Sequence, residues 1–496
     1  MLDINDLTIS EVHDKLQRKE FSCTELVKDS LDRINKYDSK VKAFITITED
    51  FALKQAEIVD SKIAKRIELK PLEGIPYSVK DVFCTEDIRT TAGSKIFDNF
   101  IPPYDATVIK RMREAGAILI GKTNCDPFGF GSSTENSGYF TTHNPYDLKR
   151  VPGGSSGGSA AAVTSGMGLF SIAEDTGGSI RQPSSFCNVS GIKVTYGRVS
   201  RYGSIAYGSS LDTVGHIAKT VEDLAAILEK TAGVDEYDAT TVPNDVPQYT
   251  KKMKESIASL QIGLPKEYFP KGGIDKDVES TIRKAAETFD DLGCHIEEIS
   301  LPHTEYAIAT YYLTAISEVS ANLARYDGIR FGYRTGKAKD LKDLYEKTRA
   351  EGFEDEVKRR IMLGTYALSA GYIDAYYKKA MQVRTLLKRE FDEAFKRVDV
   401  ILAPVAPTPP FKIGEHTDDP LAMWLEDAFT VTLNPTGCPG LAIPAGFSKS
   451  GLPIGMQLIG PQFSEDLLFK LGYHFQNATD FHERRPEIIN QIRSDN

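Results

Sequence analysis

Two serines and one lysine are the residues whose types and surroundings could carry out a reaction. Ser155 lies in a glycine-rich run, PGGSSGGSAAA, and Ser179 lies in a second run, DTGGSIRQP, directly after two glycines. Glycine costs backbone entropy, so its density around these serines predicts a backbone that approaches a ligand closely. Lys80 lies upstream, at the end of the strand-like segment IPYSVKD. A serine beside a base can attack a carbonyl carbon, so the pattern indicates nucleophilic catalysis.

No histidine occurs in these segments, so the base would have to be lysine. Lysine accepts a proton only if its pKa falls from about 10.4 toward roughly 7 to 8, a change that burial can supply. We expect Ser155 to bridge Lys80 and Ser179 and to pass the proton between them. The tight turn before the second serine could direct successive N–H groups at one point. We therefore predict an oxyanion hole formed by the backbone amides of Thr176, Gly177, Gly178 and Ser179.

Other interpretations of the same letters are weaker. The run GGSSG matches the G-x-S-x-G nucleophile elbow, but it follows Pro152 and a loop instead of a strand. The triplet DTG matches that of aspartic proteases, which need a second copy that the sequence lacks, and there is no G-x-x-x-x-G-K-[ST] loop for phosphate. The glycines could also form ordinary turns and Lys80 could be a surface lysine. Three such motifs together favour catalysis.

Composition and charge exclude several classes of protein. Among 496 residues, 60 are basic and 70 acidic, and a net charge of −10 argues against a large nucleic-acid surface. The 6 cysteines form no CxxC pair and none of the 8 histidines has HxxxH or HExxH spacing, so we expect no disulfide and no metal site. We find no signal peptide and no run near the roughly 18 to 20 apolar residues that cross a bilayer. A cytoplasmic protein is expected.

The elements that must position these residues follow an α/β pattern. Two capping boxes, Thr8 with Glu11 and Ser22 with Glu25, predict helices near the N-terminus. Strand-like segments then alternate with glycine-rich turns, and they are GIPYSVKD, AGAILIGKTN, GLFSIAEDTGG and GIKVTYGRVS. Further strand-like segments near the C-terminus are VDVILAPVAP, GLAIPAGF and PIGMQLIG, before a last helix from about Ser464.

We expect a single domain over residues 1–496. Residues 1–70 would form N-terminal helices, 71–220 the catalytic core, 221–395 a mostly helical excursion, and 396–496 the final strands and helix. A separate domain is the alternative for the helical segment. Strands on both sides of it, and the absence of a Pro/Ser/Gly hinge, favour an excursion from one sheet.

The three motifs together resemble the amidase signature family. Lys80 in a GIP-x-x-x-KD setting, PGGSSGGSAAA and DTGGSIRQP occur in the order and spacing of that family. The resemblance implies that Ser179 is the nucleophile, Ser155 the bridging serine and Lys80 the base. It also implies one α/β/α domain around a large, twisted mixed sheet.

Within this family the chain is similar, over about residues 5–480, to the A subunits of tRNA-dependent amidotransferases. The segments that carry the similarity include GKTNCDPFGFGSSTENS, TYGRVSRYG, SANLARYDGIRFG and EVKRRIMLGTYALSAGYIDAYYKKA. Such subunits hydrolyse glutamine and send the ammonia to a B subunit. The B subunit uses ATP and Mg to amidate Glu-tRNA(Gln) or Asp-tRNA(Asn), and a C subunit clamps the two together. The resemblance thus implies glutamine as substrate, B and C subunits as partners, tRNA contact mainly through the B subunit, and no cofactor in this chain.

The resemblance also implies the residues that recognise free glutamine. An arginine for the α-carboxylate and an aspartate for the α-ammonium, with a tyrosine alongside, match Arg360, Asp427 and Tyr311. Tyr312 remains an alternative to Tyr311. Helical periodicity favours Arg360 over Arg359, because the apolar positions of this helix place Arg360 near the inward face.

Two departures from the family pattern stand out. Glu174 occupies a position where a small residue is expected, and the letters CDPF at 125–128 replace a more usual MDEF. Glu174 brings a charge close to the turn of Ser179, so the rate or pH dependence of hydrolysis could differ from that of relatives. An amidase that acts alone on another amide, a non-catalytic scaffold and an amidotransferase using asparagine as ammonia donor stay open, as does the choice between Gln-tRNA and Asn-tRNA.

Overall fold

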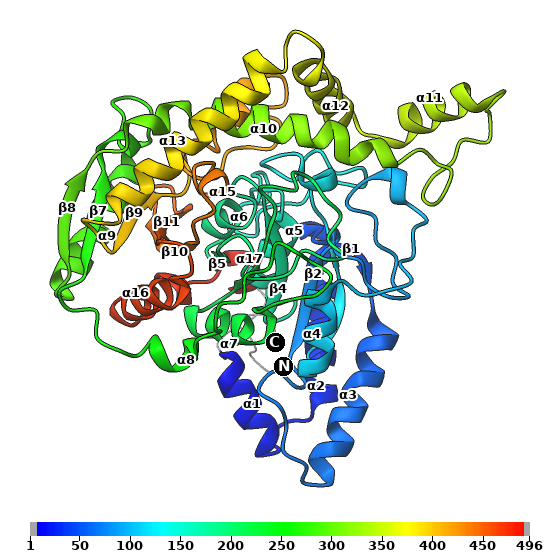
Figure 1. Ribbon diagram of the computed structural model, residues 1–496. Coiled ribbons are helices and arrows are strands. Elements are labelled where there is room, and N and C mark those ends of the chain that lie inside the picture. Colours follow the sequence, from blue (N-terminus) through cyan, green and yellow to red (C-terminus); the bar gives the residue numbers. More distant parts are fainter. Residues whose placement is uncertain (1–6, 491–496) are drawn as a thin grey trace.

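A sheet of 11 strands forms the centre of the molecule in the computed structural model, which describes residues 7–490 (Figure 1). Its strand order is β1-β3-β2-β4-β6-β5-β10-β11-β9-β7-β8. The strands are β1 (Phe44–Ile47), β2 (Pro76–Lys80), β3 (Ile118–Thr123), β4 (Phe170–Asp175), β5 (Ser190–Lys193), β6 (Thr213–Ala218), β7 (Gln261–Pro265), β8 (His295–Ile299), β9 (Val400–Pro404), β10 (Gly440–Phe447) and β11 (Pro453–Ile459).

Helices surround this sheet. The α-helices are α1 (Ile9–Gln17), α2 (Cys23–Val41), α3 (Glu49–Ala64), α4 (Thr107–Ala115), α5 (Gly157–Thr164), α6 (Arg181–Phe186), α7 (Val221–Thr231), α8 (Tyr249–Lys252), α9 (Lys276–Asp291), α10 (Ala307–Asn322), α11 (Leu341–Gly352), α12 (Asp355–Leu368), α13 (Lys379–Ala394), α14 (Pro420–Leu425), α15 (Leu433–Thr436), α16 (Glu465–Ala478) and α17 (Glu487–Asn490). Shorter turns are the 3-10 segments η2 (Lys95–Phe97), η3 (Pro127–Gly129), η4 (Lys266–Tyr268), η5 (Pro302–Tyr306), η6 (Leu323–Arg325) and η8 (Phe481–Glu483), and the π-helix η7 (Asp374–Lys378).

The sheet is mixed, as the resemblance implied. Strand β2 runs parallel to β3 and β4, and β7 runs parallel to β8 and β9, whereas the other neighbouring strands are antiparallel. The strands predicted at GIPYSVKD, AGAILIGKTN, GLFSIAEDTGG and GIKVTYGRVS are β2, β3, β4 and β5, and those predicted near the C-terminus are β9, β10 and β11. The predicted α/β fold class is therefore confirmed.

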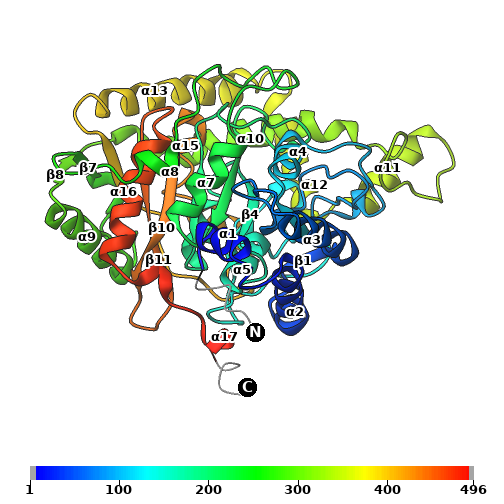
Figure 2. The same ribbon diagram turned by 90° about the horizontal axis from the view of Figure 1, so that it is seen from below.

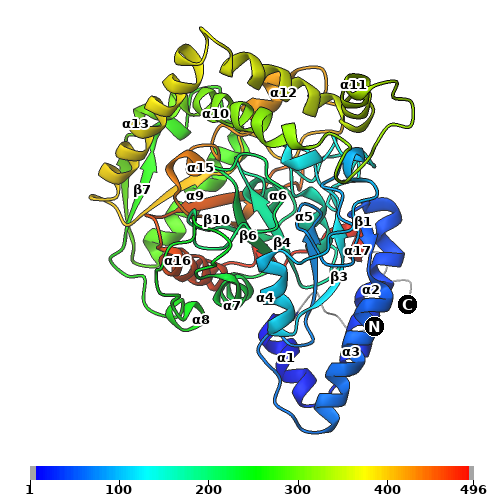
Figure 3. The ribbon, with the colours of Figure 1, turned by 45° about the vertical axis from the view of Figure 1, so that its right-hand side comes forward.

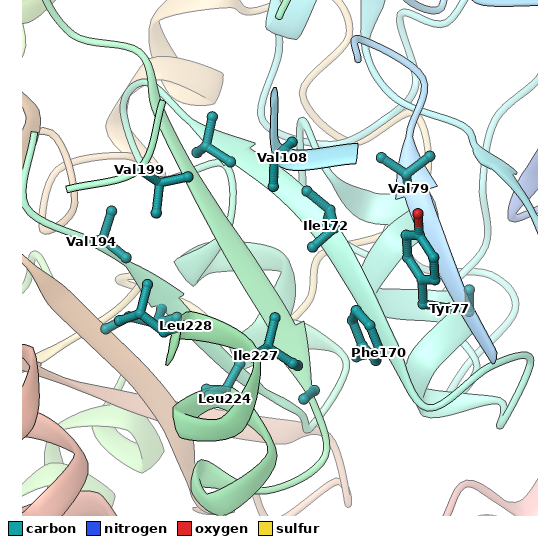
Figure 4. Close-up of a cluster of buried hydrophobic side chains, with 14 of the residues drawn as sticks. Tyr77, Val79, Val108, Phe170, Ile172, Val194, Val199, Leu224, Ile227 and Leu228 are labelled. Atoms are coloured by element: carbon teal, nitrogen blue, oxygen red, sulfur yellow. The ribbon is translucent and has the colours of Figure 1, made fainter. Parts of the chain in front are cut away.

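Helices cover both faces of the sheet because its strands are apolar on both faces. Ala173 of β4 is buried in one cluster with Ala160 of α5. The preceding residue, Ile172, points the other way, toward a cluster that includes Leu224 of α7. Figure 4 shows this second cluster, in which Tyr77 of β2 and Phe170 of β4 stack with ring centroids 5.1 Å apart. The α/β/α layering follows from this alternation.

The helices α10, α12 and α13 form a further layer at the top of Figures 1 and 3, above the segments that connect the central strands. On the other side of the molecule α16 lies beside β10, as Figure 2 shows, and α9 contacts β9. Segment 221–395 contains most of these helices, but it also supplies β7 and β8 at the end of the central sheet. These two strands were not predicted.

The helix caps, the last helix and the cysteines were also subjects of sequence predictions. Both capping boxes form: Thr8 and Glu11 bond reciprocally at the start of α1, and Ser22 and Glu25 do so at α2. The last predicted helix is α16, which follows Ser464. All 6 cysteines are buried free thiols. Between residues 7 and 490, none of the helices combines the length and apolar character of a bilayer-spanning segment. The signal-peptide prediction falls partly on residues 1–6, outside the described part.

Candidate active site

Lys80 and Ser155 are brought together in the interior of the protein. Lys80 is the last residue of β2, and its side chain is fully buried. Its Nζ donates a hydrogen bond to Ser155 Oγ at 2.7 Å. The peptide bond between Gly154 and Ser155 is cis, and the serine precedes α5 in the glycine-rich run. The amine and hydroxyl are therefore in position to exchange a proton.

Ser179 lies in the turn that links β4 to α6, next to the segment that carries Ser155. The backbone N–H of Ser156 donates to the carbonyl of Ser179 at 3.2 Å, which joins the two serine-containing segments. Ser179 is 7% exposed, whereas Ser155 is fully buried. Within residues 7–490 the Ser179 hydroxyl has no hydrogen-bond partner. A nucleophile that must meet a substrate requires such an accessible, uncommitted oxygen.

A buried ion pair fixes the turn before Ser179. Arg181 Nη2 lies 3.0 Å from Asp175 Oδ1, and both side chains are fully buried. Asp175 also accepts the backbone N–H groups of Gly178, at 2.9 Å, and Ile180, at 3.1 Å. Burial raises the pKa of the Asp175 carboxyl, but the charge and hydrogen bond of Arg181, together with Lys193 and the Ile180 N–H, lower it to about 2. The carboxylate thus stays charged and organises the turn.

The predicted oxyanion hole is only partly free. The Gly178 N–H is occupied by Asp175, whereas the N–H groups of Thr176, Gly177 and Ser179 have no acceptor among residues 7–490. These three donors are available to an oxyanion. The role of the four amides remains a prediction.

Glycine is required at two positions of this turn. A Cβ at Gly177 would lie 2.4 Å from Cζ of Tyr311, which covers the turn. Gly178 has φ +139°, a conformation that other residues rarely adopt, and a Cβ there would lie 2.3 Å from Oγ1 of Thr430. The glycines therefore allow Tyr311 and Thr430 to approach the backbone beside Ser179.

Arg360 is buried on the inward face of α12. It is 4% exposed, whereas the side chain of Arg359 is 47% exposed, so the predicted orientation of the two arginines is confirmed. Its Nη1 donates to the Tyr207 hydroxyl at 2.7 Å and its Nε to Glu356 at 2.7 Å. Although burial disfavours the charged form, Tyr207 and Glu356 raise the pKa of Arg360 above its ordinary value. Among residues 7–490 its Nη2 has no partner, which leaves one face for a ligand.

Asp427 is a buried carboxylate without a cation beside it. It is 6% exposed and accepts hydrogen bonds from the hydroxyls of Ser132, at 2.7 and 2.8 Å, and Tyr312, at 2.8 Å. Within the described part of the chain, no basic group lies within 4.0 Å of it. Burial raises the pKa of Asp427 to about 6, against the effect of the two hydroxyls. The group is therefore mainly anionic at neutral pH, and the Arg360 guanidinium acts on it only from beyond ion-pair distance.

The two tyrosines whose register the sequence left open occupy different places. Tyr312 binds Asp427, and its ring lies 5.5 Å from the Arg360 guanidinium. Tyr311 covers Gly177, and its hydroxyl lies 3.5 Å from that of Tyr207, the partner of Arg360. Tyr311 thus links Arg360, through Tyr207, to the turn of the nucleophile, and Tyr312 lies beside both Arg360 and Asp427.

A second connection runs through Thr430, whose hydroxyl lies 2.7 Å from the Gly177 carbonyl and 3.1 Å from that of Asp427. A cleft of about 430 Å³ borders this region and is lined in part by Arg360 and Trp424. Trp424 stacks on the Asp427 partner Tyr312 with ring centroids 4.3 Å apart. The cleft therefore reaches Arg360, one of the residues predicted to bind substrate.

The family model described as Amidase matches residues 25–469. This chain belongs to the amidase family. A Heliobacterium modesticaldum protein, named as the A subunit of glutamyl-tRNA(Gln) amidotransferase, is 55% identical over 481 residues, which cover 97% of this chain and 98% of that protein. The crystal structure of the Thermotoga maritima protein of the same name is 40% identical, has a TM-score of 0.79, and covers 95% of this chain and 94% of that one.

A structure of a bacterial aryl acylamidase, 24% identical, has a TM-score of 0.84 over 97% of this amidase and 99% of that chain, and so shares its fold. The resemblance stated from the motifs is confirmed by the family match. Ser132, Tyr207 and Asp175 contribute to the site of this amidase but were not predicted. The only signal for Ser132 was its place in GFGSSTENS, a segment that carries the family resemblance.

Replacing Arg181 with methionine should strongly destabilise this amidase. The change leaves Asp175 buried without its cation, and breaking a buried pair costs about 3–5 kcal/mol. In the natural protein the folded pKa of about 2 lies below the unfolded value of about 3.9. The contribution of Asp175 is therefore fully present above about pH 4 and is lost as the pH falls toward 2.

Urea unfolding at neutral pH measures this effect. The matched control is Arg283→Met, which breaks the exposed i,i+4 pair with Glu279 on α9 and should cost less than about 1 kcal/mol. Equal losses in the two variants would contradict a structural role for the buried pair.

Proposed function

We propose that this amidase is the glutamine-hydrolysing subunit of a tRNA-dependent amidotransferase. The ammonia would convert Glu-tRNA(Gln) to Gln-tRNA(Gln) in a complex with B and C subunits. The B subunit would use ATP and Mg and make the main tRNA contact. Relatives of the same length that carry this name support the proposal. So does the net charge of −10, which suits a subunit that leaves tRNA to a partner. We propose the cytoplasm as its compartment, because tRNA is aminoacylated there.

The buried charge of Asp427, which among residues 7–490 has no cation within ion-pair distance, carries the choice of glutamine. Burying a carboxylate without a cation costs free energy, and the α-ammonium of a bound amino acid would supply the missing cation. Arg360 offers its free Nη2 to an α-carboxylate. A free α-amino acid has both groups, whereas a simple amide has neither. Together the two side chains favour glutamine, whose side-chain amide would extend toward Ser179.

The proposed reaction is acyl transfer through a glutamyl-enzyme. Neutral Lys80 takes a proton from Ser155 as Ser155 takes the proton of Ser179, whose Oγ attacks the amide carbon. The oxyanion accepts hydrogen bonds from the free backbone amides of Thr176 and Gly177 and from that of Ser179. The proton held by Lys80 returns through Ser155 to the leaving nitrogen, and ammonia departs.

Water then hydrolyses the glutamyl ester by the same proton path. Lys80 again accepts a proton through Ser155, this time from the attacking water, and the oxyanion forms a second time under the same amides. Collapse of this intermediate breaks the ester bond, and the Ser179 oxygen recovers a proton. Glutamate is released and the resting state returns.

Replacing Arg360 with glutamine should raise the KM for glutamine about 10- to 100-fold, because one charge-assisted hydrogen bond is lost. The matched control is Arg359→Gln, the exposed neighbour on the same helix, which should keep the natural KM. Steady-state glutamate release measures both. An unchanged KM in Arg360→Gln would remove the assigned role of this residue.

The same assay tests the proposed function against its alternatives. The natural chain, alone and with its co-expressed partner chains, is offered glutamine, asparagine and simple amides. Preference for glutamine and co-purification with a tRNA-binding, ATP-using partner would support the proposal. Equal hydrolysis of simple amides without a partner would favour an amidase that acts alone, and a preference for asparagine would identify a different ammonia donor.

A further inference from the structure

Glu174 is in direct contact with the proposed base. It is the penultimate residue of β4 and is 4% exposed. Its Oε2 accepts a hydrogen bond from Lys80 Nζ at 2.9 Å, and the same nitrogen lies 2.7 Å from Ser155 Oγ. The amine therefore has one charged partner, the Glu174 carboxylate, and two neutral ones, Ser155 Oγ and the Glu174 backbone carbonyl at 3.4 Å. The family pattern predicted a small residue at this position.

The other oxygen of Glu174 belongs to a chain of buried groups. Glu174 Oε1 bonds to Thr176 Oγ1, which also lies 2.8 Å from Oδ1 of Asp212. A hydroxyl has one hydrogen and can donate to only one of two carboxylates. One of the two acids must therefore carry a proton for both contacts to be hydrogen bonds, as in carboxyl pairs that share a site.

Asp212 is the better holder of that proton. It is 5% exposed and accepts hydrogen bonds from the backbone N–H groups of Tyr207 and Gly208, each at 2.9 Å. Burial, and next the negative charge of Glu174, raise the pKa of Asp212 to about 8. Neutral Asp212 donates to Thr176, and Thr176 donates to Glu174. In this arrangement the Glu174 carboxylate accepts hydrogen bonds from both Thr176 and Lys80.

Other titratable groups near Lys80 lie on the neighbouring elements. Asp126 and Cys125, which follow β3, act on Lys80 only through space, and burial raises the pKa of both, that of Asp126 to about 7. Asp81, next in sequence to Lys80, is held by Lys122 of β3 at 3.2 Å. Among residues 7–490, Glu174 is the acidic residue within ion-pair distance of the Lys80 amine.

We propose that Glu174 is a positioning residue for the base: its carboxylate holds Lys80 at Ser155 and stabilises the ammonium form, so that it sets the pH above which Ser179 becomes reactive. This inference rests on the acyl-transfer mechanism proposed above. The carboxylate stabilises the Lys80 ammonium at two stages. In the free enzyme the ammonium must first lose its proton to solvent before Lys80 can act as a base. During the attack by Ser179, Lys80 regains a proton through Ser155 and becomes an ammonium again. The carboxylate thus raises the pH that activation needs and also accelerates the attack that follows.

The variant Glu174→Gln tests both effects of the carboxylate, on the pH that activation needs and on the rate of the attack. The probe is phenylmethylsulfonyl fluoride, which needs no glutamine site: the Ser179 oxygen bonds to sulfur, the S–F bond breaks, and the serine proton passes through Ser155 to Lys80. The inactivation rate of the full chain is measured against pH. The acid limb of the profile should move about 1–3 units lower, because an opposite charge beside the ammonium is lost. The alkaline plateau should fall roughly tenfold.

Three further variants make the result specific. Glu174→Ser, with the small side chain of the family pattern, should move the limb the same way, and it replaces Glu174→Gln if that variant does not fold. Glu174→Asp keeps the charge and should restore most of the natural profile. The matched control is Glu73→Gln, a 4% exposed glutamate before β2 that pairs with Lys62 and should leave the limb in place.

A lowered plateau with an unmoved limb in both the Gln and Ser variants would overturn the proposal, because a packing defect has that signature. Failure of the proposed function looks different. If the natural chain is labelled at Ser179 but does not hydrolyse glutamine, the substrate is wrong and the limb experiment still decides the role of Glu174. If Ser179 is not labelled in the natural chain, the mechanism itself fails.

Discussion

Replacement of Ser179 by alanine is expected to abolish glutamine hydrolysis and leave the fold intact. The hydroxyl has no hydrogen-bond partner within residues 7–490, so its loss leaves no buried group unsatisfied. The turn itself is held by the pair of Asp175 with Arg181, which the substitution does not touch. Loss of the nucleophile of a catalytic triad lowers kcat by roughly 10⁴-fold or more. Ammonia release by the purified full chain, followed over hours at high enzyme concentration, measures the residual rate.

The matched control is Ser165→Ala. Ser165 is a fully buried serine at the end of α5 whose hydroxyl also lacks a partner, and its removal should leave turnover unchanged. Intact-mass analysis adds a second readout, because only chains that retain Ser179 should gain the mass of a sulfonyl group. Turnover within a factor of ten of the natural rate in Ser179→Ala would exclude this serine as the nucleophile.

The strands that hold the site could be predicted because their sequences are apolar and bounded by glycine or proline. Strands β2, β4 and β10 are buried along nearly their whole length, as in a sheet covered on both faces, and each begins with a mainly apolar stretch although β2 ends at Lys80 and β4 at Glu174 and Asp175. Strand β8, with sequence HIEEI, is partly exposed at the sheet edge, and β1 has 4 residues. Short or charged strands give little periodic signal, and their membership of the sheet depends on pairing with distant segments.

The site could be predicted where one motif holds the chemistry, and less well where contacts join distant segments. Periodicity on α12 placed Arg360 correctly, since a helix fixes the relative directions of adjacent side chains. Spacing could not say that Glu174 reaches Lys80, because 94 positions separate them and the contact depends on the pairing of β2 with β4. Likewise Tyr311 and Tyr312 are equivalent in sequence and differ only in what each ring meets.

Replacing Lys80 with methionine should separate the chemistry of the base from its contribution to stability. Methionine keeps the unbranched apolar stem and removes the amine, so the proton of Ser179 has no acceptor. Acylation should fall by roughly 10²- to 10⁴-fold, the usual contribution of a general base. The change also leaves the Glu174 carboxylate buried without a cation, which should destabilise the fold by about 3–5 kcal/mol.

The double variant Lys80→Met with Glu174→Gln distinguishes these two effects, because it removes both charges of the pair. Most of the lost stability should return, since no buried charge is left unpaired, yet Ser179 should remain unreactive toward phenylmethylsulfonyl fluoride. Lys122→Met is the matched control. That lysine is equally buried and pairs with Asp81 at 3.2 Å, so its loss should lower stability while each folded molecule keeps its reactivity. Restored labelling in the double variant would show that some other group accepts the proton, because stability alone cannot deprotonate a serine.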